Sequence, residues 1–145
     1  MKNNSILIIG YEHNYPNTIK NTLKEVNFKC DVLLLPKNIE LYKKGAKQVD
    51  FKPIFEKIQN KIKEGKYSKF VLDVPNLTLN TQYENTNEII NYLLNKGKLM
   101  ILSGGNISRF ERVFGEKYSS IVIERDSVIR YGSHNLTKNK ILSIL

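Results

Sequence analysis

The sequence predicts an α/β fold, a three-layer sandwich with a mainly parallel sheet, helices on both faces and a C-terminal antiparallel hairpin. Two observations carry this prediction. Apolar runs rich in β-branched residues alternate along the chain with amphipathic stretches of helical period. These runs are apolar with few interruptions, as expected for parallel strands that are joined by helices and covered on both faces. For a chain of 145 residues we expect one α/β domain over residues 1–145.

Four apolar runs have the composition of buried strands. They span residues 5–11, 30–35, 69–74 and 98–102. Pro36 and Pro75 close the second and third runs, because proline cannot donate a hydrogen bond to a sheet.

Amphipathic helices are predicted between these strands. One helical face over residues 51–62 is formed by Phe51, Ile54, Phe55, Ile58 and Ile62. Pro16 and Gly97 are start and stop signals, and further helices are expected over residues 16–27, 84–94, 107–114 and 136–145. Residues 36–50 show no period and are predicted to form a long loop.

Residues 120–124 and 128–131 alternate between apolar and polar side chains, as the two strands of a hairpin do. Arg125, Asp126 and Ser127 lie between them and are predicted to form the turn. This hairpin would add an antiparallel edge to the sheet.

The chain is basic, with 23 Lys+Arg against 14 Asp+Glu and a formal net charge of +9. Such a charge fits a polyanionic partner, and nucleic acid is the candidate. Lys, Asn and Ile are also the residues that an AT-rich genome favours in any protein it encodes. A basic surface that is merely solvated therefore stays open as the alternative.

Several classes of protein and site are disfavoured by what the sequence lacks. No stretch approaches the roughly 18 apolar residues of a membrane span, and we see no secretory signal, so we expect a cytoplasmic protein. Cys30 is the only cysteine, which excludes an internal disulfide and indicates a buried thiol. The two histidines have no neighbouring ligands at metal-binding spacing, so neither a metal nor a cofactor is predicted.

Open α/β sheets bind ligands at the carboxyl ends of their strands. The residues predicted to form such a ligand site are Gly10, Asp73, Gly104, Gly105 and Asn106. The two adjacent glycines open a helix, where backbone N–H groups can converge on a phosphate, or they form an ordinary strand-to-helix turn. Asp73 either takes part in binding a ligand or metal, or accepts hydrogen bonds from the turn that follows it.

Glu12 and His13 follow the first strand side by side. A neighbouring acid and base can serve general acid/base catalysis if a substrate binds beside them. A solvated pair in a loop is the alternative. Both residues are therefore catalytic candidates only.

A segment near the C-terminus, Gly132-Ser133-His134-Asn135-Leu136-Thr137, matches the pattern G-S-x-N-[LYF]-[ST]. In this turn, and in the order of predicted elements from residue 51 onward, the chain resembles the phospholipase D superfamily over about two thirds of its length. The resemblance implies that Ser133 and Asn135 bind a phosphate, with Arg130 and Lys138 supplying positive charge. An ordinary loop with Ser133 or Asn135 as a helix cap is the alternative.

The catalytic residues of that family have no match here. Tyr118 and Ser120 stand where the family has its nucleophilic histidine and its phosphate-binding lysine, so the resemblance implies a degenerate domain. His134 falls at the variable position of the turn and is a further catalytic candidate. If the protein were active, a phosphodiesterase or nuclease-like hydrolase would be implied. A homodimer is implied too, because family members with one signature per chain build their site across two subunits.

The sequence leaves three functions open. The first is a non-catalytic, phospholipase D-like domain that binds nucleic acid or another phosphate-bearing partner through a basic surface. The second is a flavodoxin- or Rossmann-like module that binds a nucleotide or small anion at the carboxyl ends of the strands. The third is a structural or interaction protein. Positive charge and the turn at residues 132–137 both favour the first.

Overall fold

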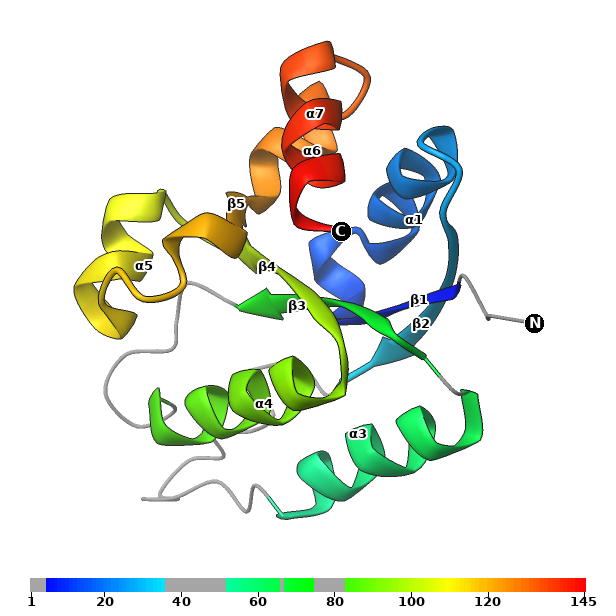
Figure 1. The fold of residues 1–145 in the computed structure, drawn as a ribbon, viewed down its shortest axis with the longest axis vertical. Helices are drawn as coiled ribbons and strands as arrows, with labels where there is room; N and C mark the ends of the chain where they lie inside the picture. The colour runs from blue at the N-terminus through cyan, green and yellow to red at the C-terminus, as the bar shows by residue number, and fades with distance from the viewer. Residues whose placement is uncertain (1–4, 36–51, 66, 75–82) are drawn as a thin grey trace.

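A computed structural model describes residues 5–35, 52–65, 67–74 and 83–145. Within these residues, five strands form one sheet in the order β2-β1-β3-β4-β5, and all neighbouring strands are parallel (Figure 1). The strands are β1 (Ser5–Gly10), β2 (Lys29–Leu34), β3 (Lys69–Val74), β4 (Lys98–Ser103) and β5 (Val122–Glu124). The mainly parallel sheet that the apolar runs predict is confirmed.

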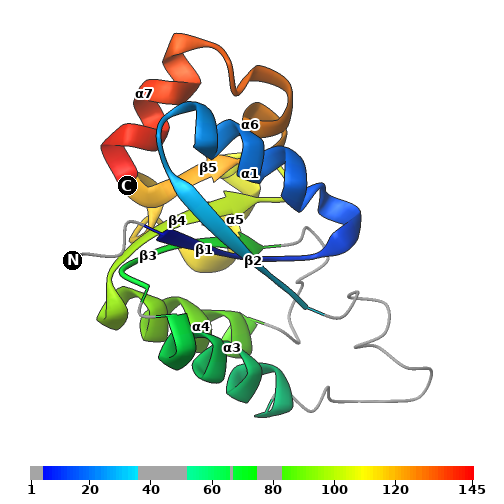
Figure 2. The same ribbon diagram turned by 90° about the vertical axis from the view of Figure 1, so that its right-hand side faces the viewer.

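Helices cover both faces of the sheet, as predicted (Figure 2). One layer contains α1 (Pro16–Glu25), α6 (Arg125–Tyr131) and α7 (Asn135–Ile144). The opposite layer contains α3 (Lys52–Gly65), α4 (Tyr83–Lys96) and α5 (Ile107–Phe114). Two short 3-10 turns, η1 (Glu12–Asn14) and η2 (Ser119–Ile121), precede α1 and β5.

The sheet separates two apolar clusters, which together form the core. Side chains of β1 alternate between them. Leu7 and Ile9 belong to the cluster with α3 and α4, whereas Ile6 and Ile8 belong to the cluster with α1 and α7. All four side chains are fully buried. Burial on both faces explains why this run is apolar throughout instead of alternating with polar residues.

The predicted C-terminal hairpin is wrong. β5 pairs in parallel with β4, with Ile101 opposite Val122 and Ser103 opposite Glu124. Residues 128–131 belong to α6, and Arg125, Asp126 and Ser127 form the first turn of that helix instead of a hairpin turn.

The path of the chain explains this difference. After the crossover through α5 the chain rejoins the sheet opposite Ile101, in the middle of β4, and runs toward the end of that strand, so β5 lies parallel to β4. A helix after β5 then covers the side of the sheet that carries α1. In this position Val128 is fully buried in the cluster that contains Ile19 and Ile141.

Two further sequence predictions concern a loop and the membrane. The long loop predicted over residues 36–50 lies outside the described residues. None of the described helices has both the length and the apolar character that crossing a membrane requires.

Candidate functional site

All strands run in parallel, but the side on which the chain adds new strands changes between β1 and β3. From β1 the chain adds β2 on one side, and it then crosses to add β3 on the other side of β1. The helices that follow β1 and β3, α1 and α4, lie on opposite faces of the sheet. This order is the flavodoxin-like variant of the doubly wound fold, and ligands of such sheets bind at the point of reversal.

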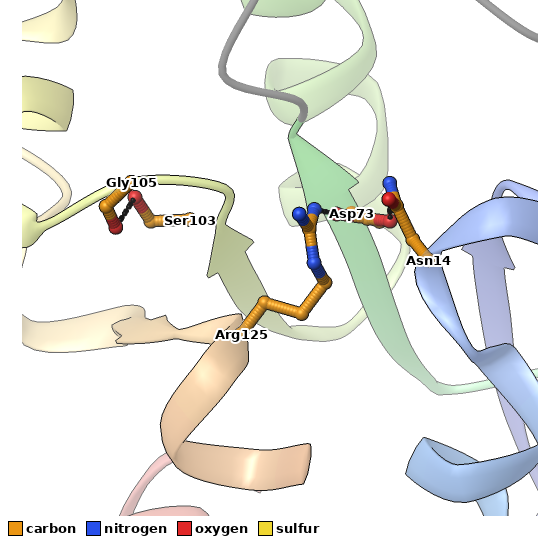
Figure 3. A network of polar contacts seen from close by, with 5 residues as sticks. All are labelled: Asn14, Asp73, Ser103, Gly105 and Arg125. Atoms are coloured by element: carbon orange, nitrogen blue, oxygen red, sulfur yellow. Dashed lines mark hydrogen bonds and ion pairs between the residues drawn. The ribbon is translucent and has the colours of Figure 1, made fainter. Parts of the chain in front are cut away.

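A buried carboxylate lies at this point. Asp73, near the end of β3, is only 3% exposed. The Asn14 side chain donates a hydrogen bond from Nδ2 to Asp73 Oδ2 over 2.7 Å. Arg125 donates from Nη1 to Asp73 Oδ1 over 2.7 Å, and the two groups form an ion pair. Figure 3 shows Asn14 and Arg125 approaching the carboxylate from opposite sides.

Three elements far apart in the sequence position this cluster. Asn14 ends η1, where its backbone N–H donates to Tyr11 O over 3.0 Å and so turns the chain back over the sheet. Tyr15 follows with a left-handed φ of 56°, and Pro16 then starts α1. Arg125 is the first residue of α6, directly after β5, and its side chain reaches past the end of β4 to Asp73 (Figure 3).

The electrostatics of Asp73 reflect two opposing effects. Burial raises the pKa of Asp73 above its ordinary value, because removal from water penalises the charged carboxylate. The charge and hydrogen bond of Arg125, the hydrogen bond from Asn14 and the charge of His13 oppose this rise. The net direction is upward, and ionisation of Asp73 therefore depends on these partners.

The cluster leaves Arg125 as the group that can meet a further anion. Both oxygens of Asp73 accept hydrogen bonds, and its side chain is 1% exposed. The guanidinium of Arg125 carries five N–H donors, and only Nη1 has a partner among the described residues. Its side chain keeps 15% of its surface exposed. The arrangement thus orients a guanidinium without using up its hydrogen bonds.

The glycine turn after β4 is built as a strand-to-helix turn. Gly104 N donates to Val74 O over 3.0 Å, and the Ser103 hydroxyl donates to Gly105 O over 2.8 Å. Asn106 caps α5, because its Oδ1 accepts a hydrogen bond from Arg109 N over 2.8 Å. A carboxylate of the protein also lies at the start of this helix, since Ile107 N donates to Glu124 Oε1 over 3.3 Å.

The predicted ligand-site residues are only partly brought together. Gly10 lies beside Asp73, with the position of an added Cβ 3.7 Å from Asp73 Cβ. The turn of Gly104, Gly105 and Asn106 lies at the same edge of the sheet, but among the described residues the hydrogen-bond partners of the Asp73 side chain are Asn14 and Arg125.

The catalytic candidates do not form one constellation. Glu12 and His13 are exposed on η1, and the ring of His13 lies 5.8 Å from that of Tyr11. His134 is exposed at the start of α7, where its ring lies 5.4 Å from that of Tyr131. No group of three or more His, Cys, Asp or Glu side chains that could hold a metal ion occurs in the described part of the chain.

The turn between α6 and α7 lies in the helical layer above the sheet, away from the strand ends (Figure 2). Ser133 and Asn135 are exposed, as is Arg130, whereas Lys138 is half-buried. His134 is the N-cap residue of α7 and no side chain caps this helix, so the expected cap by Ser133 or Asn135 is wrong, whereas an ordinary turn stays the alternative. Phosphate binding by Ser133 and Asn135 stays a prediction.

Sequence reasoning missed Asn14, Arg125 and Glu124. Each is polar and follows or ends a strand, which is the signal that pointed to Asp73. Arg125 was instead assigned to a hairpin turn, and this error hid its place at the carboxyl edge.

Comparison of the chain with models of known protein families, with characterised proteins and with solved structures gave no match. The fold and the site define the class: a doubly wound parallel α/β protein with a buried ion pair where its strand order reverses.

Proposed function

We propose that this protein is a binding module that holds a small phosphate-bearing ligand, of the nucleotide class, at the carboxyl edge of its sheet. Arg125 would contact the phosphate, and Asp73 and Asn14 would hold the guanidinium in place. The proposal rests mainly on the Asp73–Arg125 ion pair, which lies at the point where the strand order reverses. Guanidinium groups suit phosphate because two parallel N–H groups can bond two oxygens.

The energetics of the ion pair support a role beyond stability. Removing both charges from water is expensive, and well-packed apolar residues often stabilise a protein as well as or better than a buried ion pair. Buried groups with perturbed pKa values also gather at functional sites. Asp73 is such a group, and it lies where doubly wound sheets bind their ligands.

Binding without catalysis fits the chemistry of the cluster. Asp73 would have to give up a hydrogen bond to Asn14 or Arg125 before it could act as a base or nucleophile. Glu12 and His13 are exposed, and no hydrogen bond from a described residue orients them as a catalytic pair.

A nitrogen–proton correlation NMR titration of the full chain with inorganic phosphate and with ATP tests this proposal. We expect saturable shifts at the amides of Gly10, Gly104 and Gly105 and at the Asn14 side-chain amide. Arg125→Gln should weaken binding about tenfold or more, because hydrogen bonds to charged groups contribute about 1.5–3 kcal/mol. Arg125→Lys keeps the charge without the planar fork and should give an intermediate loss.

The matched control is Arg130→Gln, which removes an exposed arginine from the same helix. It should bind as the unmodified protein does. Absence of saturable shifts at the carboxyl edge, or unchanged binding by a folded Arg125→Gln variant, would overturn the proposal. Shifts confined to residues 133–135 would favour instead the phosphate-binding turn implied by the resemblance to phospholipase D.

A further inference from the structure

A groove of about 630 Å³ lies between α1 and the edge strand β2. Its lining includes Lys20 and Lys24 of α1, and Phe28, Lys29 and Asp31 of the following turn and strand. Because Lys29 is the first residue of β2, the groove lies at the amino end of that strand. The ion pair of Asp73 lies at the opposite end of the sheet.

The groove is positively charged. None of its three lysines forms an ion pair with a described residue. The acid in the lining, Asp31, accepts a hydrogen bond from the Tyr67 hydroxyl. Three ammonium groups against one carboxylate repel one another, and an anionic partner would relieve this repulsion.

A fourth lysine adds to this charge. Lys69, the first residue of β3, places Nζ 4.9 Å from the centroid of the Phe28 ring. The sheet register sets Lys69 opposite Ile6, on the face of the sheet that carries α1 and Phe28, whereas Lys29 lies opposite Ser5 at the next position of the register. Lys69 therefore brings a cation from β3 to the aromatic ring of a groove that Lys20 and Lys24 of α1 also line.

We infer that this groove binds single-stranded nucleic acid. A basic groove with an aromatic ring is the combination by which proteins hold single strands, with phosphates on the cations and a base against the ring. Two of the lysines, Lys20 and Lys24, are one helical turn apart and so face the same side of α1. An acidic peptide would use the lysines but not Phe28. This inference concerns a second site and does not depend on the ligand proposed for Arg125.

Fluorescence anisotropy with a short labelled oligothymidylate, at about 50 mM and about 200 mM salt, tests the inference. Each phosphate contact with a single strand contributes about 0.7 to the slope of log affinity against log salt. Three contacts give a slope with a magnitude of about 2. Replacing Lys20, Lys24 and Lys29 by Gln should therefore reduce the magnitude of the slope by about 2. It should also reduce the affinity about tenfold or more at the lower salt.

A second triple variant is the matched control. Replacing the exposed Lys63, Lys117 and Lys140 by Gln removes the same net charge from other elements. It should reduce affinity less than about threefold. Phe28→Leu, which keeps an apolar group in the core, should weaken binding about fivefold or more, because stacking of a base on an aromatic ring is lost.

Three results would overturn the inference. The first is a folded protein that does not bind oligothymidylate at the lower salt. The second is an equal loss of affinity in the two triple variants, which would mean that total charge alone matters. The third is tighter binding of duplex DNA or polyglutamate than of oligothymidylate.

Discussion

Arg125 Nη1 lies 2.7 Å from Asp73 Oδ1, and this ion pair joins the first turn of α6 to the end of β3. The two residues are 52 positions apart. The contact reaches past the end of the intervening strand β4 and ties the last part of the chain to the middle of the sheet (Figure 3). We expect the stability of the protein and its dependence on pH to be sensitive to this pair.

Arg125→Met is expected to lower the free energy of unfolding by about 3 kcal/mol at neutral pH, because it leaves the Asp73 carboxylate buried without its cation. Urea denaturation followed by circular dichroism measures this loss. Arg130→Met makes the same chemical change at an exposed position of the same helix and should stay within about 0.5 kcal/mol. A loss below about 1 kcal/mol for Arg125→Met would mean that the pair contributes little to stability.

The raised pKa of Asp73 predicts the sign of a pH effect. In the folded state the pKa of Asp73 lies above the unfolded value of about 3.8, so the folded protein binds the proton more tightly than the unfolded chain does. The contribution of Asp73 to the free energy of unfolding therefore falls as pH rises from about 3.8 through the folded-state pKa. Asp73→Asn removes this titration. The free energy of unfolding of Asp73→Asn minus that of the unmodified protein should therefore increase with pH.

Urea denaturation of both proteins between about pH 3 and about pH 7 measures this difference. A difference that decreases as pH rises would show the reverse balance. In that case the attraction of Arg125 would exceed the effect of burial and hold the pKa of Asp73 below its ordinary value.

Gly132→Ala should destabilise the protein by about 1–3 kcal/mol through steric overpacking. An added Cβ would lie 2.5 Å from Thr22 Cγ2 and 2.6 Å from Val128 O, and a backbone oxygen cannot easily move aside. The backbone φ of Gly132 is −59°, so alanine itself meets no conformational strain. Thermal denaturation compares this variant with Ser133→Ala, an exposed neighbour that should change stability by less than about 0.5 kcal/mol.

Equal stability of these two variants would contradict close packing of this turn on α1. A large loss confined to Gly132→Ala would show that the glycine is needed for packing, whatever the role of Ser133 and Asn135.

Cys30 should resist alkylation in the folded protein. Burial raises the pKa of its thiol from 9.0 to about 11, although the charge of Lys20 partly opposes this rise. The reactive thiolate is therefore about 100-fold scarcer than for an ordinary cysteine near pH 8. Mass spectrometry after iodoacetamide treatment should show labelling about 100-fold slower or more in buffer than in urea. Equal rates in the two conditions would show that the thiol is exposed.

Much of the sheet follows from local pattern. The run Ile6-Leu7-Ile8-Ile9 is apolar without interruption, and such a run of β-branched and leucine residues fits a strand covered on both faces. The predicted ranges of the first four strands agree with β1 to β4 to within one residue at each end. These assignments succeed because burial on both faces leaves a signature in consecutive residues.

Residues 128–131 show where local pattern fails. Their alternation of apolar and polar side chains resembles a strand, yet they form the second half of α6. Whether these residues form a strand or a helix depends on the residues that pack against them in the folded chain. Val128 is buried in the same apolar cluster as Ile19, and Gly132 allows the chain to approach Thr22 of α1. None of these neighbours is close in sequence, so periodicity alone could not choose between strand and helix.

The sequence by itself determined the α/β class, the strand ranges that end at the carboxyl edge, and the presence of a carboxylate at Asp73. Only the tertiary structure decided the strand order, the direction of β5 and the partners of Asp73, which lie 59 and 52 residues away at Asn14 and Arg125. The physical reason is that secondary structure depends on neighbours along the chain, whereas a buried charge depends on whichever groups the topology brings within hydrogen-bond distance.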